Sequence, residues 1–231
     1  MISQTTEIEY PPISDYGLIG DCHSTALVSR AGSIDWACLP RMDSPSIFGR
    51  LLDWNRGGYC RIHPAAAARV RRRYIPGTLV LETIFHTDEG RARITDCFTM
   101  KRGGAQTPYQ QLLRIIDGLE GRVTFEIEAV ARFQYGSVRP LVRRIDETTF
   151  TILGSDCGLI LSTDMNLEIR DRHDLFGRCT VAGGDRRRLS IVFELPERID
   201  DLNFHASTLG ACDSRLDATV EWWHRWRQGS L

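Results

Sequence analysis

Apolar and polar side chains alternate along residues 123–133, and this period of two constrains the fold more than any other feature of the chain. Every second residue from Val123 to Phe133 is apolar, and most residues between them, such as Glu126 and Glu128, are polar or charged. Successive side chains of a β-strand point to opposite faces of its sheet. The pattern therefore predicts a strand with one buried face and one solvated face.

Shorter stretches of the same kind recur along the chain, separated by turn-forming residues. We expect further strands over residues 79–86, 91–98, 148–153, 159–162, 178–182 and 188–195. We expect turns at 88–90, 117–118, 146–147, 154–155 and 183–184. Many strands at a spacing of roughly 8 to 12 residues predict a mainly β fold, an antiparallel β-sandwich. Two helices are expected, a short one near residues 46–52 and a longer one over 207–228.

Length, charge and cysteine content exclude several classes of function. At 231 residues the chain can bury a core of its own, and its 29 basic residues nearly balance its 30 acidic ones. That balance predicts neither a nucleic acid nor a membrane surface as a partner. Seven cysteines without a CxxC pair, and an N-terminus without the features of a signal peptide, favour reduced thiols and a cytoplasmic location. Because the chain has no P-loop and no GxGxxG motif, no cofactor is predicted.

The segment 15–45 combines a predicted hairpin with a polar loop. A turn in which Gly32 supplies a positive φ angle joins two short apolar stretches. Pro40 and Pro45 each lack a backbone N–H, so the end of the segment cannot be a central strand. A presented polar loop is expected there instead.

Three motifs carry a family resemblance: DYGLIGD at 15–21, ALVSRAGSIDW at 26–36 and PRMDSPSIF at 40–48. Further similar stretches, in the same order and at similar spacing, lie at 74–83, 114–121 and 132–136. On these residues the sequence resembles the N-terminal β-sandwich domain of bacterial proteins of glycoside hydrolase family 15, the glucoamylase-like and trehalase-like enzymes.

The resemblance implies a sandwich domain over residues 1–206, followed over residues 207–231 by a linker helix toward a helical-barrel catalytic domain. It implies that the parent protein hydrolyses α-glucosidic bonds with inversion. In such enzymes one carboxyl group protonates the leaving oxygen and another activates water, and in the resembled family both are glutamates of the barrel. No stretch of this sequence matches the barrel motifs. No catalytic residue is therefore assigned, and this chain alone is expected to be inactive.

The loop and the preceding strand supply three candidates for contact with a sugar substrate: Trp36, Arg41 and Asp43. An aromatic plane stacks on a sugar ring, and a charged fork hydrogen-bonds its hydroxyl groups. The alternative role for an aspartate in such a context is to cap a turn or pair with an arginine. That alternative applies to Asp43 and equally to Asp15, Asp21, Asp35 and Asp96.

The predicted C-terminal helix carries an apolar stripe at helical spacing, made of Leu209, Cys212, Leu216, Val220 and Trp223. Trp222 and Trp226, four residues apart, widen it on the neighbouring face. Two interpretations stay open. The three tryptophans pack on this domain, or some of them contact a second domain. In the second case the isolated chain is predicted to self-associate through this helix.

A metal site is not expected. Asp21, Cys22 and His23 form an adjacent trio of potential ligands, but in a strand Cys22 points away from the other two. A different class of function also stays open, a free-standing carbohydrate-binding or assembly module. In the enzyme interpretation, an α-glucoside meets this chain only through the catalytic domain of the parent protein.

Overall fold

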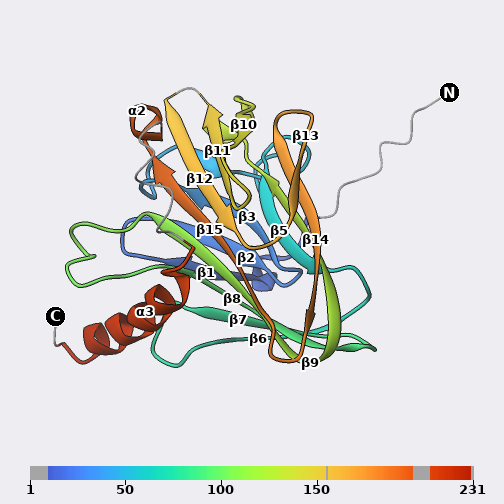
Figure 1. Ribbon diagram of the computed structural model, residues 1–231. Coiled ribbons are helices and arrows are strands. Elements are labelled where there is room, and N and C mark those ends of the chain that lie inside the picture. The colour runs from blue at the N-terminus through green and yellow to red at the C-terminus, as the bar shows by residue number, and fades with distance from the viewer. Residues whose placement is uncertain (1–9, 155, 200–208, 230–231) are drawn as a thin grey trace.

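The computed structural model describes residues 10–154, 156–199 and 209–229 (Figure 1). Its strands are β1 (Tyr16–Gly20), β2 (Thr25–Ser29), β3 (Ser33–Cys38), β4 (Ser46–Phe48), β5 (Tyr59–Pro64), β6 (Arg69–Tyr74), β7 (Leu81–His86), β8 (Gly90–Phe98), β9 (Gln111–Val130), β10 (Leu141–Arg144), β11 (Thr149–Gly154), β12 (Cys157–Thr163), β13 (Leu167–Arg170), β14 (Asp174–Ala182) and β15 (Arg186–Glu194). Its helices are the 3-10 turn η1 (Ile13–Asp15), α1 (Phe133–Gly136), α2 (Pro196–Ile199) and α3 (Cys212–Arg227).

The strands form an antiparallel β-sandwich, as the sequence predicts. We call β1–β5, β13, β14 and the second half of β9 the first sheet, and β6–β8, β10–β12, β15 and the first half of β9 the second sheet. β9 thus pairs with β8 and β15 in one sheet and with β5 and β14 in the other. The two layers and their shared strand are visible in Figure 1.

The core lies between the two sheets and is filled by the apolar half of each alternating pattern. Phe125 and Ile127 of β9 are fully buried, while Glu126 and Glu128 face the outer side of the first sheet. Across the sandwich, the ring of Phe85 on β7 packs edge to face on Phe125, with centroids 5.9 Å apart. Burying each such side chain contributes about 1.5–3 kcal/mol to folding.

The turn expected at residues 117–118 is wrong, because both residues lie inside β9. The register between β8 and β9 shifts at this point. A Cβ atom on Gly118 would lie 1.9 Å from the carbonyl oxygen of Ala182, so only glycine fits there. The glycine marks a close approach between backbones along a continuous strand, and local sequence does not distinguish this from a turn.

The short helix expected near residues 46–52 is also wrong. Ser46–Phe48 is β4, which pairs with β3 and buries the side chains of Ile47 and Phe48. After β4 the amide of Gly49 donates to the carbonyl of Gly57 at 2.6 Å, so the chain turns back instead of winding into a helix. Pairing between distant segments has overridden a local pattern.

The long C-terminal helix is confirmed as α3, which begins at Cys212 and packs against the second sheet (Figure 1). Its expected start at 207, the proposed domain boundary at 206, and half of the expected turn at 154–155 lie outside the described residues.

A fully buried arginine joins the two sheets. Nε of Arg114 on β9 donates to the carboxylate of Asp96 on β8 at 2.7 Å, and Asp96 is also buried. Its Nη1 donates to the carbonyl of Cys60 on β5 at 2.7 Å, and its Nη2 donates to the carbonyl of Gly32 at 2.8 Å. Burial alone would lower the pKa of Arg114, but Asp96 and Cys60 together outweigh burial and raise it. The guanidinium is therefore charged and ties the second sheet to two segments of the first.

Replacing Arg114 with Met should lower the free energy of unfolding by about 3–5 kcal/mol, because Asp96 is left charged and unpaired in the core. Adding Asp96→Leu should restore only part of that loss, since the two carbonyl groups still lack a donor. Urea denaturation of both variants measures this. Arg225→Ala, which breaks an exposed ion pair with Glu221, is the control and should change stability by less than about 1 kcal/mol. Equal stability of the Arg114 and Arg225 variants would contradict the assignment.

Candidate functional site

The loop predicted from the two prolines lies after β3 and is anchored at its base. The hydroxyl of Ser24 donates to the carbonyl of Pro40 at 2.6 Å, and the amide of Met42 donates to the carbonyl of His23 at 2.7 Å. The turn that supplies these partners is itself capped by Asp21, whose Oδ1 accepts the amides of His23 and Ser24. The loop is therefore fixed to the rest of the first sheet by its backbone.

Arg41 and Asp43 meet at the surface of this loop. The guanidinium donates from Nε to Oδ1 at 2.9 Å and from Nη2 to Oδ2 at 3.2 Å, a two-pronged pair. Both side chains are 66% exposed. The hydrogen bond from Arg41 holds the pKa of Asp43 below its ordinary value, so the carboxylate is ionised at neutral pH. The structure thus brings together two of the three predicted contact residues and presents them to solvent.

Trp36, the third predicted residue, lies on β3 and not on the loop. Its half-buried ring lies beside that of Tyr135, with centroids 6.5 Å apart and planes inclined by 31°. Tyr135 is half exposed and, like Gln134, has a left-handed backbone, with φ of 59° and 49° respectively. The sequence analysis assigned no role to Tyr135, although it belongs to the stretch 132–136 that resembles the family.

The turn that carries Tyr135 is held rigidly despite its strained backbone. Phe133 is fully buried and exchanges two backbone hydrogen bonds with Val138, at 2.9 and 3.1 Å. Consecutive non-glycine residues in the left-handed region persist only where the surrounding structure over-determines them. The Trp36–Tyr135 pair is therefore a fixed aromatic feature of this face.

Asp35 and Asp96 have the structural role that the sequence left as an alternative. Asp35 is buried and accepts hydrogen bonds from the hydroxyls of Tyr16 at 2.8 Å and Ser33 at 2.5 Å, with Arg50 at 3.8 Å. Burial and the bond to Asp35 raise the pKa of Tyr16. Asp96 pairs with Arg114. Neither carboxylate is accessible to a substrate.

The Asp21–His23 trio lies in a turn. Cys22 is exposed, and Oδ1 of the buried Asp21 accepts the amides of His23 and Ser24. In the part of the chain that the structure describes, no three potential ligands gather closely enough to hold an ion.

Two of the three tryptophans of α3 are buried against this domain. Trp222 and Trp223 are 4% and 5% exposed and pack in a cluster with Val80, which precedes β7, and with Cys97, Leu113 and Ile115 of the second sheet. Trp226 is 54% exposed and touches Trp223 edge to face, with centroids 5.7 Å apart. Only the Trp226 ring retains substantial surface for a contact with another domain.

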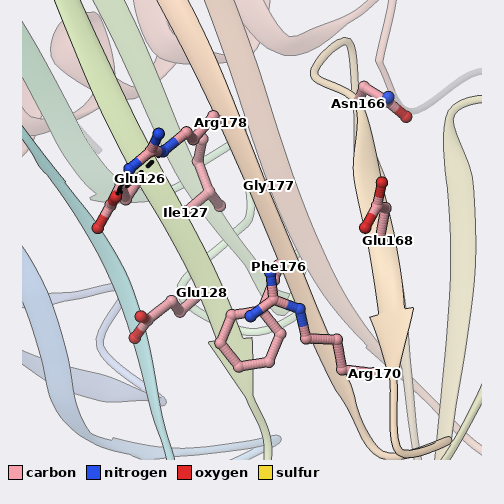
Figure 2. Close-up of a pocket in the computed structure, with 9 residues that line it drawn as sticks. All are labelled: Glu126, Ile127, Glu128, Asn166, Glu168, Arg170, Phe176, Gly177 and Arg178. Carbon is pink, nitrogen blue, oxygen red and sulfur yellow. Dashed lines mark hydrogen bonds and ion pairs between the residues drawn. The ribbon is translucent and has the colours of Figure 1, made fainter. Parts of the chain in front are cut away.

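A groove of about 550 Å³ lies on the outer face of the first sheet, between β9, β13 and β14 (Figure 2). Glu126 and Glu128 come from β9, Phe176 and Arg178 from β14, and Asn166, Glu168 and Arg170 from β13 and the residue before it. Alternation along β9 predicts that its two glutamates are solvated. It does not predict the groove, because β13 and β14 are brought there by pairing between distant segments.

Two further observations bear on the setting of the protein. Free thiols are found at Cys22, Cys38, Cys60, Cys97, Cys157 and Cys179. No helix in the described ranges has the length and apolar character that crossing a bilayer requires.

Comparison with known proteins decides the family. Residues 6–222 match the model of the family described as trehalase-like, N-terminal. The chain belongs to this family. A trehalase of Mycolicibacterium smegmatis is 38% identical over 145 residues, which cover 56% of this chain and 21% of that protein. A trehalase of Mycobacterium tuberculosis is 35% identical over 141 residues, covering 54% of this chain and 21% of that protein. A trehalase of Thermoplasma volcanium is 25% identical over 232 residues, covering 99% of this chain and 36% of that protein.

These extents place the trehalase-like N-terminal domain within longer relatives. The chain matches about a fifth of each mycobacterial protein and about a third of the Thermoplasma one. The family match accounts for the motifs of the opening segment, including the predicted loop, and it extends through most of α3.

The two indole environments on α3 give a paired prediction for the trehalase-like domain. Trp223→Ala should lower the free energy of unfolding by about 3–5 kcal/mol, because a large buried side chain is lost. Trp226→Ala should change it by less than about 0.5 kcal/mol, because the ring is exposed. The same Trp226 variant should weaken any concentration-dependent self-association. Thermal denaturation and sedimentation velocity test both statements, and equal destabilisation by the two changes would contradict the packing described.

Proposed function

We propose that this chain is the non-catalytic N-terminal domain of a glycoside hydrolase family 15-like α-glucosidase, of the trehalase or glucoamylase type. The observation that carries the proposal is the family match over residues 6–222, together with relatives named trehalases that are several times longer than the matched region. In this role the sandwich supports a helical-barrel catalytic domain, and α3 is the linker helix of a second segment, 207–231.

The two glutamates of β9 that line the groove do not suit the role of catalytic acid. An inverting glycosidase needs one carboxylic acid with a raised pKa that protonates the leaving group. The hydrogen bond from Arg178 lowers the pKa of Glu126. Burial would raise the pKa of Glu128, but hydrogen bonds from Arg61 and Tyr59 outweigh burial and lower it. Neither neighbouring carboxylate is suited to be the acid, and in this proposal both reacting glutamates belong to the catalytic domain.

The loop that carries Arg41 and Asp43 is proposed to reach the rim of the catalytic site. Its base is fixed by backbone hydrogen bonds and its charged tip is exposed, so binding a ligand would cost little ordering entropy. Trp36 belongs to the same candidate set, and Tyr135 lies beside it. The exposed Trp226 ring is the proposed contact of α3 with the catalytic domain, alongside the two buried tryptophans of the same helix.

A cytoplasmic location and an α-glucoside substrate complete the proposal. The free thiols at six cysteines fit a reducing compartment. The substrate is proposed to contact this domain only where the catalytic domain presents it.

The chain alone should hydrolyse neither trehalose nor maltose. The reason is that the two reacting carboxyl groups are proposed to lie in another domain. An assay of glucose release by rigorously purified chain tests this, with a glucosidase-spiked sample as the positive control. Glucose release above the buffer level, by an activity that copurifies with the folded chain, would overturn the non-catalytic assignment.

In a protein that joins this domain to its catalytic domain, Arg41→Ala or Asp43→Ala should lower kcat/KM about tenfold or more, equivalent to ~1.4 kcal/mol of lost transition-state binding. Folded stability should change little, because both side chains are exposed. Arg30→Ala, which breaks another surface Arg–Asp pair, is the matched control and should leave the kinetics unchanged. If both loop variants retain wild-type kinetics, the loop has only a structural role.

A further inference from the structure

The groove on the first sheet has one rigid wall. On β9, Glu126 accepts from Nε of Arg178 at 3.1 Å and also from its Nη2, and His63 of β5 lies 3.4 Å away. Glu128 accepts two hydrogen bonds from Arg61 of β5, at 2.9 and 3.2 Å. Each carboxylate has spare lone pairs beyond these bonds. This wall therefore presents ionised acceptors that are already paired with arginines.

The opposite wall has polar groups without protein partners. Within the described residues, the side chains of Asn166 and Glu168 make no hydrogen bond or ion pair. Arg170 lies with its guanidinium over the ring of Phe176, 4.3 Å from the centroid (Figure 2). Its N–H groups are thus held near the groove by stacking, not by a carboxylate. An amide, a carboxylate and a guanidinium all remain available to a ligand.

The hairpin of β13 and β14 keeps this wall in place. A Cβ on Gly177 would lie 2.4 Å from the carbonyl oxygen of Asn166 and 2.6 Å from the side chain of Leu167. Glycine thus permits β13 to lie tightly against β14, with Leu167 buried in the core. The spacing between the two walls is therefore set by packed backbone. The volume of the groove, about 550 Å³, lies within the ~300–1,000 Å³ typical of small-molecule sites.

The charges of the groove indicate a neutral ligand. Three carboxylates, Glu126, Glu128 and Glu168, stand against the guanidinium groups of Arg170 and Arg178, and Arg61 neutralises one carboxylate from behind. A strongly charged ligand would meet groups of its own sign on either wall. Hydroxyl groups both donate and accept, and so can satisfy guanidinium, amide and carboxylate together. The half-buried Phe176 ring, on which Arg170 stacks, adds one apolar group to the groove.

We propose that this groove is a binding site for a neutral oligosaccharide, separate from the Trp36–Asp43 surface. Asn166, which precedes β13, and Glu168 and Arg170 of β13 would supply most of the new hydrogen bonds. Glu126 and Glu128 would orient the hydroxyl groups. The site does not depend on the proposed catalytic domain, because all of its groups belong to this chain.

The test is an NMR titration of the isotope-labelled chain with maltotriose and with trehalose. We expect saturable shifts of backbone amides confined to β9, β13 and β14. The double variant Glu168→Ala, Arg170→Ala should weaken binding about tenfold or more, and its fold should persist because neither residue pairs with another charged group. The matched control is Arg91→Ala, Glu120→Ala, which removes an exposed Arg–Glu pair at 2.8 Å in the second sheet and should leave binding unchanged.

Two charged sugars, glucose 6-phosphate and glucosamine, distinguish the neutral-ligand proposal from binding by charge. Weaker shifts with both than with the neutral sugars would support it. Tighter binding of either one would overturn it, as would the absence of saturable shifts in these strands with both neutral sugars. An equal loss of binding in the control variant would also overturn it. None of these outcomes bears on catalysis by a parent protein, so the two proposals can fail separately.

Discussion

The contact between Arg114 and its three partner residues is the constraint on which the two sheets depend. A guanidinium without access to water is tolerated only if its charge and its donors are all matched. Asp96 supplies the charge, and the carbonyls of Gly32 and Cys60 accept the remaining donors. Because these partners come from both sheets, β9 cannot slip in register without leaving a buried charge unpaired. The main effect of the Arg114–Asp96 pair is therefore to favour one packing of the two sheets, and its net contribution to stability is smaller.

The turn at Gly32 connects the Arg114 contact to β3 and so to the candidate loop that follows β3. Nη2 of Arg114 donates to the carbonyl of Gly32 in this turn. The amide of Ile62 donates to the same oxygen at 3.1 Å. β3 follows directly, and its buried Asp35 is fixed by Tyr16 and Ser33. The loop therefore leaves a strand whose position is determined from the core outward. This is the arrangement in which loops carry binding residues on rigid scaffolds.

The sequence predicted what depends on local periodicity and missed what depends on pairing between distant segments. Alternation along residues 123–133 identified the second half of β9, and helical spacing identified α3. Ser46–Phe48 was mistaken for helix because its pairing with β3 is set by tertiary contacts. Arg41 and Asp43 are two residues apart, so their proximity could be predicted. Trp36 and Tyr135 are nearly a hundred positions apart, and no spacing relates them.

The two candidate surfaces differ in what a ligand must displace. Arg41 and Asp43 are hydrogen-bonded to each other, and an exposed pair of this kind contributes little net free energy because both groups stay in contact with water. A ligand at the loop must exchange these bonds for its own and gains little by itself. In the groove, Asn166 and Glu168 have no protein partner to give up among the described residues, and the opposite wall is already fixed. A sugar should therefore bind the isolated chain at the groove, while the loop contributes only when a second surface already holds the substrate beside it.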